Sequence, residues 1–184
     1  GDWAIEADSN EFNNNLLPRA NPQIYNWTSC GDPGAEEGSE AFRGVLFRRG
    51  TAVTFRNFLI LGSRTLGMQI DGSATLDQVN NGTTQVGAGV VFGSATPFHA
   101  ATLPFVNNGR FPNVRAGVDP GIAGCFQHDN PNFQPSGVAT LAGGQLAPIL
   151  PPNDGFFEAV TFIGAVPPAP QDDWTKGWTA YPQR

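Results

Sequence analysis

The segment FRNFLILG at residues 55–62 repeats the pattern of an earlier segment, IYNWTSCG at residues 24–31. When the two segments are superposed, Asn57 falls on Asn26, and both segments end in glycine. Short runs rich in aromatic and β-branched residues and bounded by glycine are typical of β-strands. The repetition therefore predicts two equivalent strands that lie side by side in a structure built from stacked repeats.

A second set of short segments alternates with the first: DWAIEADS at 2–9, GVLFRRGT at 44–51 and GMQIDGS at 67–73. The interval between the equivalent residues Val45 and Met68 is 23 residues, within the range of about 20–50 residues that is typical of solenoids. The sequence therefore predicts an all-β fold, a short right-handed parallel β-helix in which each strand lies beside its equivalent in the previous turn. Its apolar positions fall in two columns, Trp3–Val45–Met68 and Ile5–Phe47–Ile70.

The repeat pattern predicts coils over residues 1–95, interrupted by an acidic, glycine-rich loop at 31–42. Such an insertion is tolerated because closing a longer loop costs little additional entropy. Residues 96–149 carry frequent turn signals and are expected to form a loop-rich region of the same domain, and no helix is predicted. Residues 150–184 are expected to pack on the coils as an aromatic, proline-rich tail with its large side chains buried: Phe156, Phe157, Phe162, Trp174 and Trp178.

Side chains alternate between the two faces of a strand, so Ile24, Asn26, Thr28 and Cys30 are expected to share one face. We assign this face to the interior of the coil. A buried amide needs a hydrogen-bond partner, and Asn57 in the next turn can supply one for Asn26. The sequence therefore predicts a structural asparagine ladder, made of Asn26 and Asn57, along the axis of the coil.

The same alternation places Tyr25, Trp27, Phe58 and Ile60 on the outward face of these strands. Trp27 above Phe58 is a large apolar surface, which soluble monomers rarely leave exposed to water. The sequence leaves two alternatives for what covers this patch: the aromatic tail of the chain, or a partner protein that binds there.

In the first set of strands, the alignment puts Glu6, Arg48 and Asp71 in one outward column. Neighbouring strands lie about 4.8 Å apart, so side chains in one column are close enough to pair. The sequence therefore predicts a surface charge ladder of alternating sign along these three residues.

Composition excludes several classes of function. The 184 residues include 16 acidic and 10 basic side chains, with a net charge of −6 and no basic run, which argues against a nucleic-acid partner. No apolar stretch reaches the length that spans a membrane. Low lysine with abundant glycine, asparagine and aromatic residues favours an extracytoplasmic location, in the periplasm or at the cell surface. Cys30 and Cys125 allow either one disulfide or two buried thiols.

The segments RRGT, FRNFLILG and GMQIDG, together with the tail GFFEAVTFIGA…DDWTKGWT, resemble bacterial secreted proteins of the pectate-lyase-like β-helix class. The resemblance covers residues 2–73 and 153–179. It implies a parallel β-helix, a true C-terminus near Arg184 and further coils before Gly1. The motifs that carry it are structural, so they specify the fold rather than an activity.

Active members of that class cleave acidic polysaccharides with calcium held by carboxylates and an arginine base, or with paired aspartates near a Gly-His-Gly motif. Here Arg48, Arg49 and Arg56 have no matching carboxylate cluster around them in the sequence, and Gly-His-Gly is absent. Asp172 and Asp173 are adjacent, so they face opposite sides of an extended segment. We therefore expect no catalytic site, no metal site and no cofactor.

The function expected from the sequence is that of a non-catalytic, extracytoplasmic structural or interaction module. We expect it to be an accessory subunit, docked through a protein partner on a larger envelope-associated assembly. The alternative, which rests on fold analogy, is a carbohydrate-binding or polysaccharide-lyase-like β-helix protein.

Overall fold

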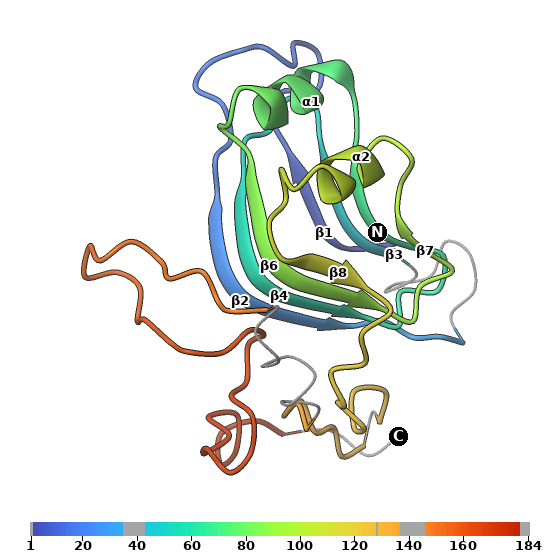
Figure 1. Ribbon diagram of the computed structural model, residues 1–184, viewed down its shortest axis with the longest axis vertical. Coiled ribbons are helices and arrows are strands. Elements are labelled where there is room, and N and C mark those ends of the chain that lie inside the picture. The colour runs from blue at the N-terminus through green and yellow to red at the C-terminus, as the bar shows by residue number, and fades with distance from the viewer. Residues whose placement is uncertain (1, 35–42, 128, 137–145, 181–184) are drawn as a thin grey trace.

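A computed structural model describes residues 2–34, 43–127, 129–136 and 146–180. Successive strands alternate between two four-stranded parallel sheets (Figure 1). The first sheet contains β1 (Trp3–Asp8), β3 (Arg43–Arg48), β5 (Leu66–Ile70) and β7 (Thr96–Phe98), in that order. The second contains β2 (Gln23–Cys30), β4 (Thr54–Leu61), β6 (Gln85–Phe92) and β8 (Val114–Ala116). The all-β character and the parallel stacking are confirmed, but the described strands form two open sheets rather than a closed solenoid.

The register of the second sheet follows the sequence repeat. Ile24 pairs with Phe55 and Cys30 with Leu61, and the same register continues from β4 to β6. Strand pairing also extends beyond residue 95, because β7 pairs with β5 and β8 with β6.

The register of the first sheet differs from the sequence alignment at one strand. Val45 pairs with Met68, as aligned, but β1 is displaced by two residues, so Ile5 pairs with Val45 and Asp8 with Arg48. A slip of two residues keeps every side chain on its original face, so the apolar pattern does not distinguish the two registers. The column predicted for Glu6, Arg48 and Asp71 was wrong in the register of Glu6, whose backbone lies opposite Leu46, although the predicted ion pair between Glu6 and Arg48 is present.

One residue in each coil of the second sheet has a left-handed backbone conformation. The φ angles are 55° at Asn26, 59° at Asn57, 48° at Ala88 and 57° at Asn113. These residues occupy equivalent positions, because paired residues flank the first three in their ladders and Asn113 directly precedes Val114, which pairs with Gly89. The strands bend sharply along their length (Figure 1), and the bend changes which residues face inward on its far side.

The main core lies between the two sheets and is built from aromatic and aliphatic side chains. Phe55 stacks on Phe58 with ring centroids 4.4 Å apart, and Phe47 meets Phe55 edge-on at 5.6 Å. Ile60 and Met68 are fully buried in the same cluster. A second, smaller core lies on the other face of the second sheet, beyond the bend, and contains Leu59, Leu61, Val90, Ile122, Cys125, Leu146 and Ile163.

Within the described ranges, two short helices interrupt the strands, although the sequence predicted none. α1 (Ser73–Asn80) follows Gly72, and α2 (Leu103–Asn107) carries proline in its first turn. The apolar pattern missed α1 because two of its four buried residues, Thr75 and Gln78, are polar. The Thr75 hydroxyl accepts a hydrogen bond from the Gly50 amide at 2.9 Å. No helix among the described residues is long and apolar enough to cross a membrane.

Candidate functional site

The side chains of Asn26 and Asn57 hold the C-terminal segment against the second sheet. Asn57 Nδ2 donates to Asn26 Oδ1 at 3.2 Å and to the Ile149 carbonyl at 2.9 Å, and Asn57 Oδ1 accepts from the Ile149 amide at 2.8 Å. Asn26 Nδ2 donates to the carbonyls of Phe162 and Gly164 at 2.8 and 3.1 Å. The two amides meet as a ladder, but their assignment to the coil interior was wrong. They face the segment that covers the sheet.

The patch expected on the outward face is divided by the bend. Phe58 and Ile60 are fully buried between the two sheets, and Trp27 packs partly buried against the same core. Only Tyr25, which precedes the left-handed residue, faces outward, and its ring meets Phe157 of the tail at 4.9 Å. The expectation of an exposed or covered patch was therefore wrong for three of its four residues, because the left-handed asparagine reverses the alternation of faces.

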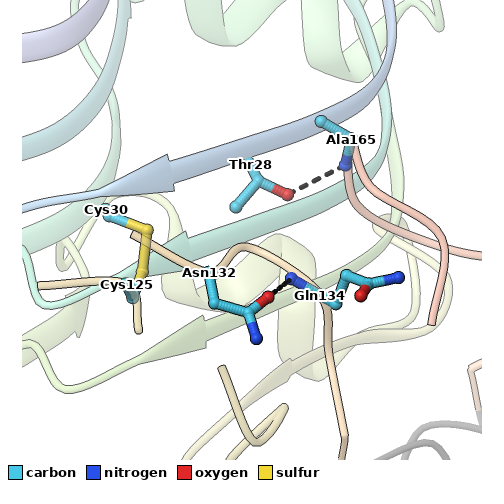
Figure 2. The surroundings of a disulfide bond; sticks show 6 residues. All are labelled: Thr28, Cys30, Cys125, Asn132, Gln134 and Ala165. Atoms are coloured by element: carbon cyan, nitrogen blue, oxygen red, sulfur yellow. Dashed lines mark hydrogen bonds between the residues drawn. A yellow bond between two sulfur atoms is a disulfide. The ribbon is translucent and has the colours of Figure 1, made fainter. Parts of the chain in front are cut away.

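The outward face beyond the bend carries other apolar residues, which residues 146–166 cover. Leu59 and Leu61 pack there against Ile163. Gly164 lies so close that a Cβ atom at this position would be 2.6 Å from a methyl carbon of Leu59. The Thr28 hydroxyl accepts a hydrogen bond from the next backbone amide, that of Ala165, at 2.8 Å (Figure 2).

A disulfide joins Cys30 at the end of β2 to Cys125, 95 residues later, with their Cα atoms 5.5 Å apart (Figure 2). This bond decides between the two alternatives that the sequence left open. It ties the first coil to the segment that follows β8, next to the covered strip of Leu59 and Leu61.

A network of ion pairs lies on the outer face of the first sheet. Arg48 contacts Asp8 at 2.9 Å and also pairs with Glu6, while Arg49 contacts Asp8 at 2.8 Å and Glu11 at 3.2 Å. The hydrogen bond that Arg48 donates to the Asp8 carboxylate raises the pKa of Arg48 above its ordinary value. The sequence predicted the pairing of Glu6 with Arg48 but not the contacts of Asp8 and Glu11 with the arginines, because the pairing of β1 with β3 brings these residues together across about 40 residues.

Asp71, the third residue of the expected ladder, forms no ion pair with Arg48 in the described part of the chain. Within the same residues, no group of three or more His, Cys, Asp or Glu side chains is arranged to hold a metal ion.

An open groove lies on the outer face of the second sheet, before the bend. Its volume is about 590 Å³. The strand register sets Gln23, Thr54 and Gln85 in one row of its floor, with Tyr25 and Arg56 in the next. Residues 150–152 line it as well, where the C-terminal segment passes beside β2 and β4 (Figure 1). No carboxylate is among its described lining residues.

The aromatic side chains of the tail are less buried than the sequence predicted. Phe156 is 83% exposed, Trp174 53% and Trp178 68%. The two indole rings stack with centroids 5.7 Å apart, and their N–H groups donate to the carbonyls of Ala165 and Trp174. The prediction that folding buries all of these rings was wrong, because they pack on one another and on the tail's own backbone.

Comparison with known families agrees with this architecture. The model of the pectate-lyase like beta helix domain matches residues 1–106, which include every strand from β1 to β7. No curated protein and no solved structure matches the chain. Because the match covers more than half of the chain, the protein belongs to the pectate-lyase-like beta helix domain family.

Proposed function

We propose that the chain is a non-catalytic interaction module, an extracytoplasmic accessory subunit that docks on a larger envelope-associated protein assembly. The groove on the outer face of the second sheet carries this proposal. Three consecutive strands present polar side chains in register on its floor, and a segment of the tail lines it too. The described lining includes no carboxylate, histidine or cysteine, so its chemistry suits recognition rather than acid–base or nucleophilic catalysis.

The charged network on the first sheet supports a non-catalytic function. A lyase of this fold needs carboxylates free to hold a cation and an arginine able to release its proton. Here each of Glu6, Asp8 and Glu11 pairs with an arginine, and the raised pKa of Arg48 holds its proton more firmly. Paired charges of this kind are typical of a structural role on a partly exposed surface.

The disulfide supports the extracytoplasmic part of the proposal. Disulfides form and persist in oxidising compartments, whereas thiols in the cytosol are kept reduced. The bond between Cys30 and Cys125 joins distant parts of the chain next to an apolar cluster.

In this proposal the coils wind right-handed, as crossover connections between parallel strands of one sheet almost always do.

A site-specific cross-link tests the docking proposal. A photo-crosslinking side chain at Gln23, which is exposed at the groove, is expected to give a discrete adduct with a partner protein in the source cells. The same side chain at Leu103, which is 41% exposed on α2, serves as the control and is expected to give none. Equal adducts at both positions would count against docking through the groove.

An assay of polysaccharide cleavage tests the other half of the proposal. We expect no unsaturated products when the purified protein is incubated with polyuronides and calcium. Cleavage that disappears in an Arg48→Gln variant would instead establish a lyase centred on the charged network.

The stacked pair of Trp174 and Trp178 favours carbohydrate binding as a second candidate function. Both indole N–H groups are engaged within the chain, so the exposed ring surfaces are held in fixed orientation. Held aromatic surfaces suit contact with the apolar faces of sugar rings. Affinity electrophoresis through gels that contain polysaccharides tests it: retardation of the wild-type protein, lost in Trp178→Ala, would support this candidate.

A further inference from the structure

Arg56, which lines the groove, differs in its surroundings from Arg48 and Arg49 on the first sheet. Its Nη2 donates to the Gln85 side chain, but no carboxylate among the described residues forms an ion pair with it. By contrast, Arg48 and Arg49 each pair with two acidic residues. A guanidinium has five N–H donors in a fork that fits a carboxylate. In a chain with a net charge of −6, an arginine without an acidic partner in an open groove is suited to bind an anion from outside.

The floor of the groove offers further hydrogen-bonding groups. Gln23 and Thr54 lie side by side on β2 and β4, and neither side chain has a hydrogen-bond partner among the described residues. A side-chain amide supplies one donor group and one acceptor, which complements a peptide group in an extended chain. The floor can therefore hold a backbone as well as a single anionic group.

The rim of the groove is apolar along residues 150–152, which are Leu-Pro-Pro. Leu150 is 60% exposed. Successive side chains of an extended peptide point to opposite sides, so a peptide lying here can direct an acidic side chain to Arg56 and an apolar one to Leu150.

Two observations favour a peptide over an acidic polysaccharide. A polyuronide carries a carboxylate on each sugar, whereas the larger groove contains a single arginine. Arg110, which lines the adjoining pocket, already donates to the carbonyls of Val79 and Asn80. The Tyr25 ring packs against Phe157, so it is less available to stack on a sugar.

We infer that the groove binds an extended segment of a partner protein and that Arg56 binds an Asp or Glu carboxylate of that segment. This inference rests on the proposed function and names the chemistry of the partner. The groove selects its peptide through three contacts: a charge-assisted hydrogen bond between Arg56 and the acidic side chain, hydrogen bonds between the peptide backbone and the floor, and an apolar contact at Leu150.

Selection from a displayed library of random short peptides tests the inference with the full-length protein as target. Peptides enriched on the wild-type protein are expected to share one Asp or Glu next to an apolar residue. Replacing that acid by its amide is expected to weaken binding about tenfold or more. Arg56→Gln is expected to weaken the acidic peptide similarly and the amide peptide little, while the control Arg115→Gln, in an exposed residue of β8, changes neither.

Three results would overturn the inference: no peptide enrichment, enriched peptides without an acidic residue, or equal affinity of the acidic peptide for the wild-type protein and Arg56→Gln. Binding of oligogalacturonate that depends on Arg56, with no peptide bound, would assign the groove to a glycan instead. The cross-link at Gln23 separates this inference from the proposed function. If the partner adduct forms equally in Arg56→Gln, the proposed docking through the groove is supported and the proposed role of Arg56 is wrong. If the wild-type protein forms no adduct at all, both the docking proposal and the role of Arg56 are wrong.

Discussion

Asn57 adopts a left-handed backbone conformation inside a strand, and its side chain bonds both Asn26 and the main chain of Ile149. Asparagine tolerates this conformation better than most residues because its short polar side chain can hydrogen-bond locally. The same residue therefore sets the bend of the coil and anchors the segment that covers it. The left-handed conformation is shared by the equivalent residues Asn26, Asn57 and Asn113, and the side chains of Asn26 and Asn57 also anchor the covering segment.

Two substitutions separate the roles of Asn57. Asn57→Ala removes the hydrogen bonds and leaves an alanine in the left-handed region, so we expect a loss of about 2–4 kcal/mol in the free energy of unfolding. Asn57→Gly removes the same bonds without backbone strain and should be about 1–2 kcal/mol more stable than the alanine variant. Urea denaturation measures both values. Equal stability of the two variants would show that the backbone conformation contributes nothing.

Gly89 gives a second prediction at the residue scale. A methyl group at this position would overlap the ring of Phe58, which is fully buried between the sheets. Gly89→Ala should therefore lower the free energy of unfolding by about 1–3 kcal/mol through overpacking. Phe58→Leu vacates part of that space, so the double variant should lose less than the sum of the two single losses. Additive losses, measured by denaturation, would contradict this contact.

At the scale of the element, the sequence repeats were sufficient for the register of β2 with β4 and of β3 with β5, but not for the pairings of β6, β7 and β8. The repeat around Asn26 and Asn57 contains enough distinct positions to predict the register of β2 and β4. The only pattern that aligns β1 with β3 is the alternation of apolar side chains, which repeats every two residues. A displacement by two residues gives an equally good alignment, so the sequence could not predict the observed register. Helix α1 was missed because Thr75 and Gln78 occupy buried positions where the apolar pattern requires hydrophobic residues.

The candidate site was less predictable than the strands. The side chains of a strand no longer alternate between the same two faces after a left-handed residue. A single asparagine in an apolar strand does not change the polarity pattern enough to predict this reversal. The groove combines β2, β4 and β6 with residues 150–152, and only the folded chain brings them together. Of the residues singled out in advance, Tyr25 and Arg56 lie in the groove.

The ion pairs between β1 and β3 give a prediction that reports on the register. Arg48→Gln should cost about 1 kcal/mol, because it removes two partly exposed pairs worth about 0.2–1 kcal/mol each. A double-mutant cycle with Asp8→Asn should give measurable coupling at low salt that weakens at high salt. The matching cycle with Asp71→Asn should give none. Absence of coupling between Arg48 and Asp8 would argue against the register in which Asp8 lies opposite Arg48.

At the scale of the whole molecule, the disulfide and the C-terminal segment act on the same surface. Cys30 and Cys125 close a loop of 95 residues, and restricting the unfolded chain in this way is worth roughly 4–5 kcal/mol in the loop-entropy model. The paired variant Cys30→Ser/Cys125→Ser should lose up to this amount in a denaturation experiment. A reducing agent should destabilise the wild-type protein similarly and leave the variant unchanged. A wild-type protein that is insensitive to reduction would argue against the bond.

Shortened proteins distinguish the part of the tail that holds the fold from the part that is exposed. Ending the chain after Val166 removes Trp174 and Trp178, which are more than half exposed, so this protein should stay folded and in the same association state as the full-length protein. Ending it at residue 145 also removes Ile149, Phe162 and Ile163, and with them the partners of both asparagine amides.

The shorter of the two proteins exposes Leu59 and Leu61 to water, together with two amides that have lost their partners in the covering segment. Burial of apolar surface is the main source of stability, and an exposed apolar strip promotes aggregation. We therefore expect it to aggregate or unfold, while the protein that ends at Val166 keeps its thermal transition. Size-exclusion chromatography and thermal denaturation make the comparison. If both proteins behave alike, the contacts of residues 146–166 with the second sheet do not contribute to stability. If only the longer one is folded, those residues are an integral layer of the molecule, and residues 167–184 are free to serve recognition.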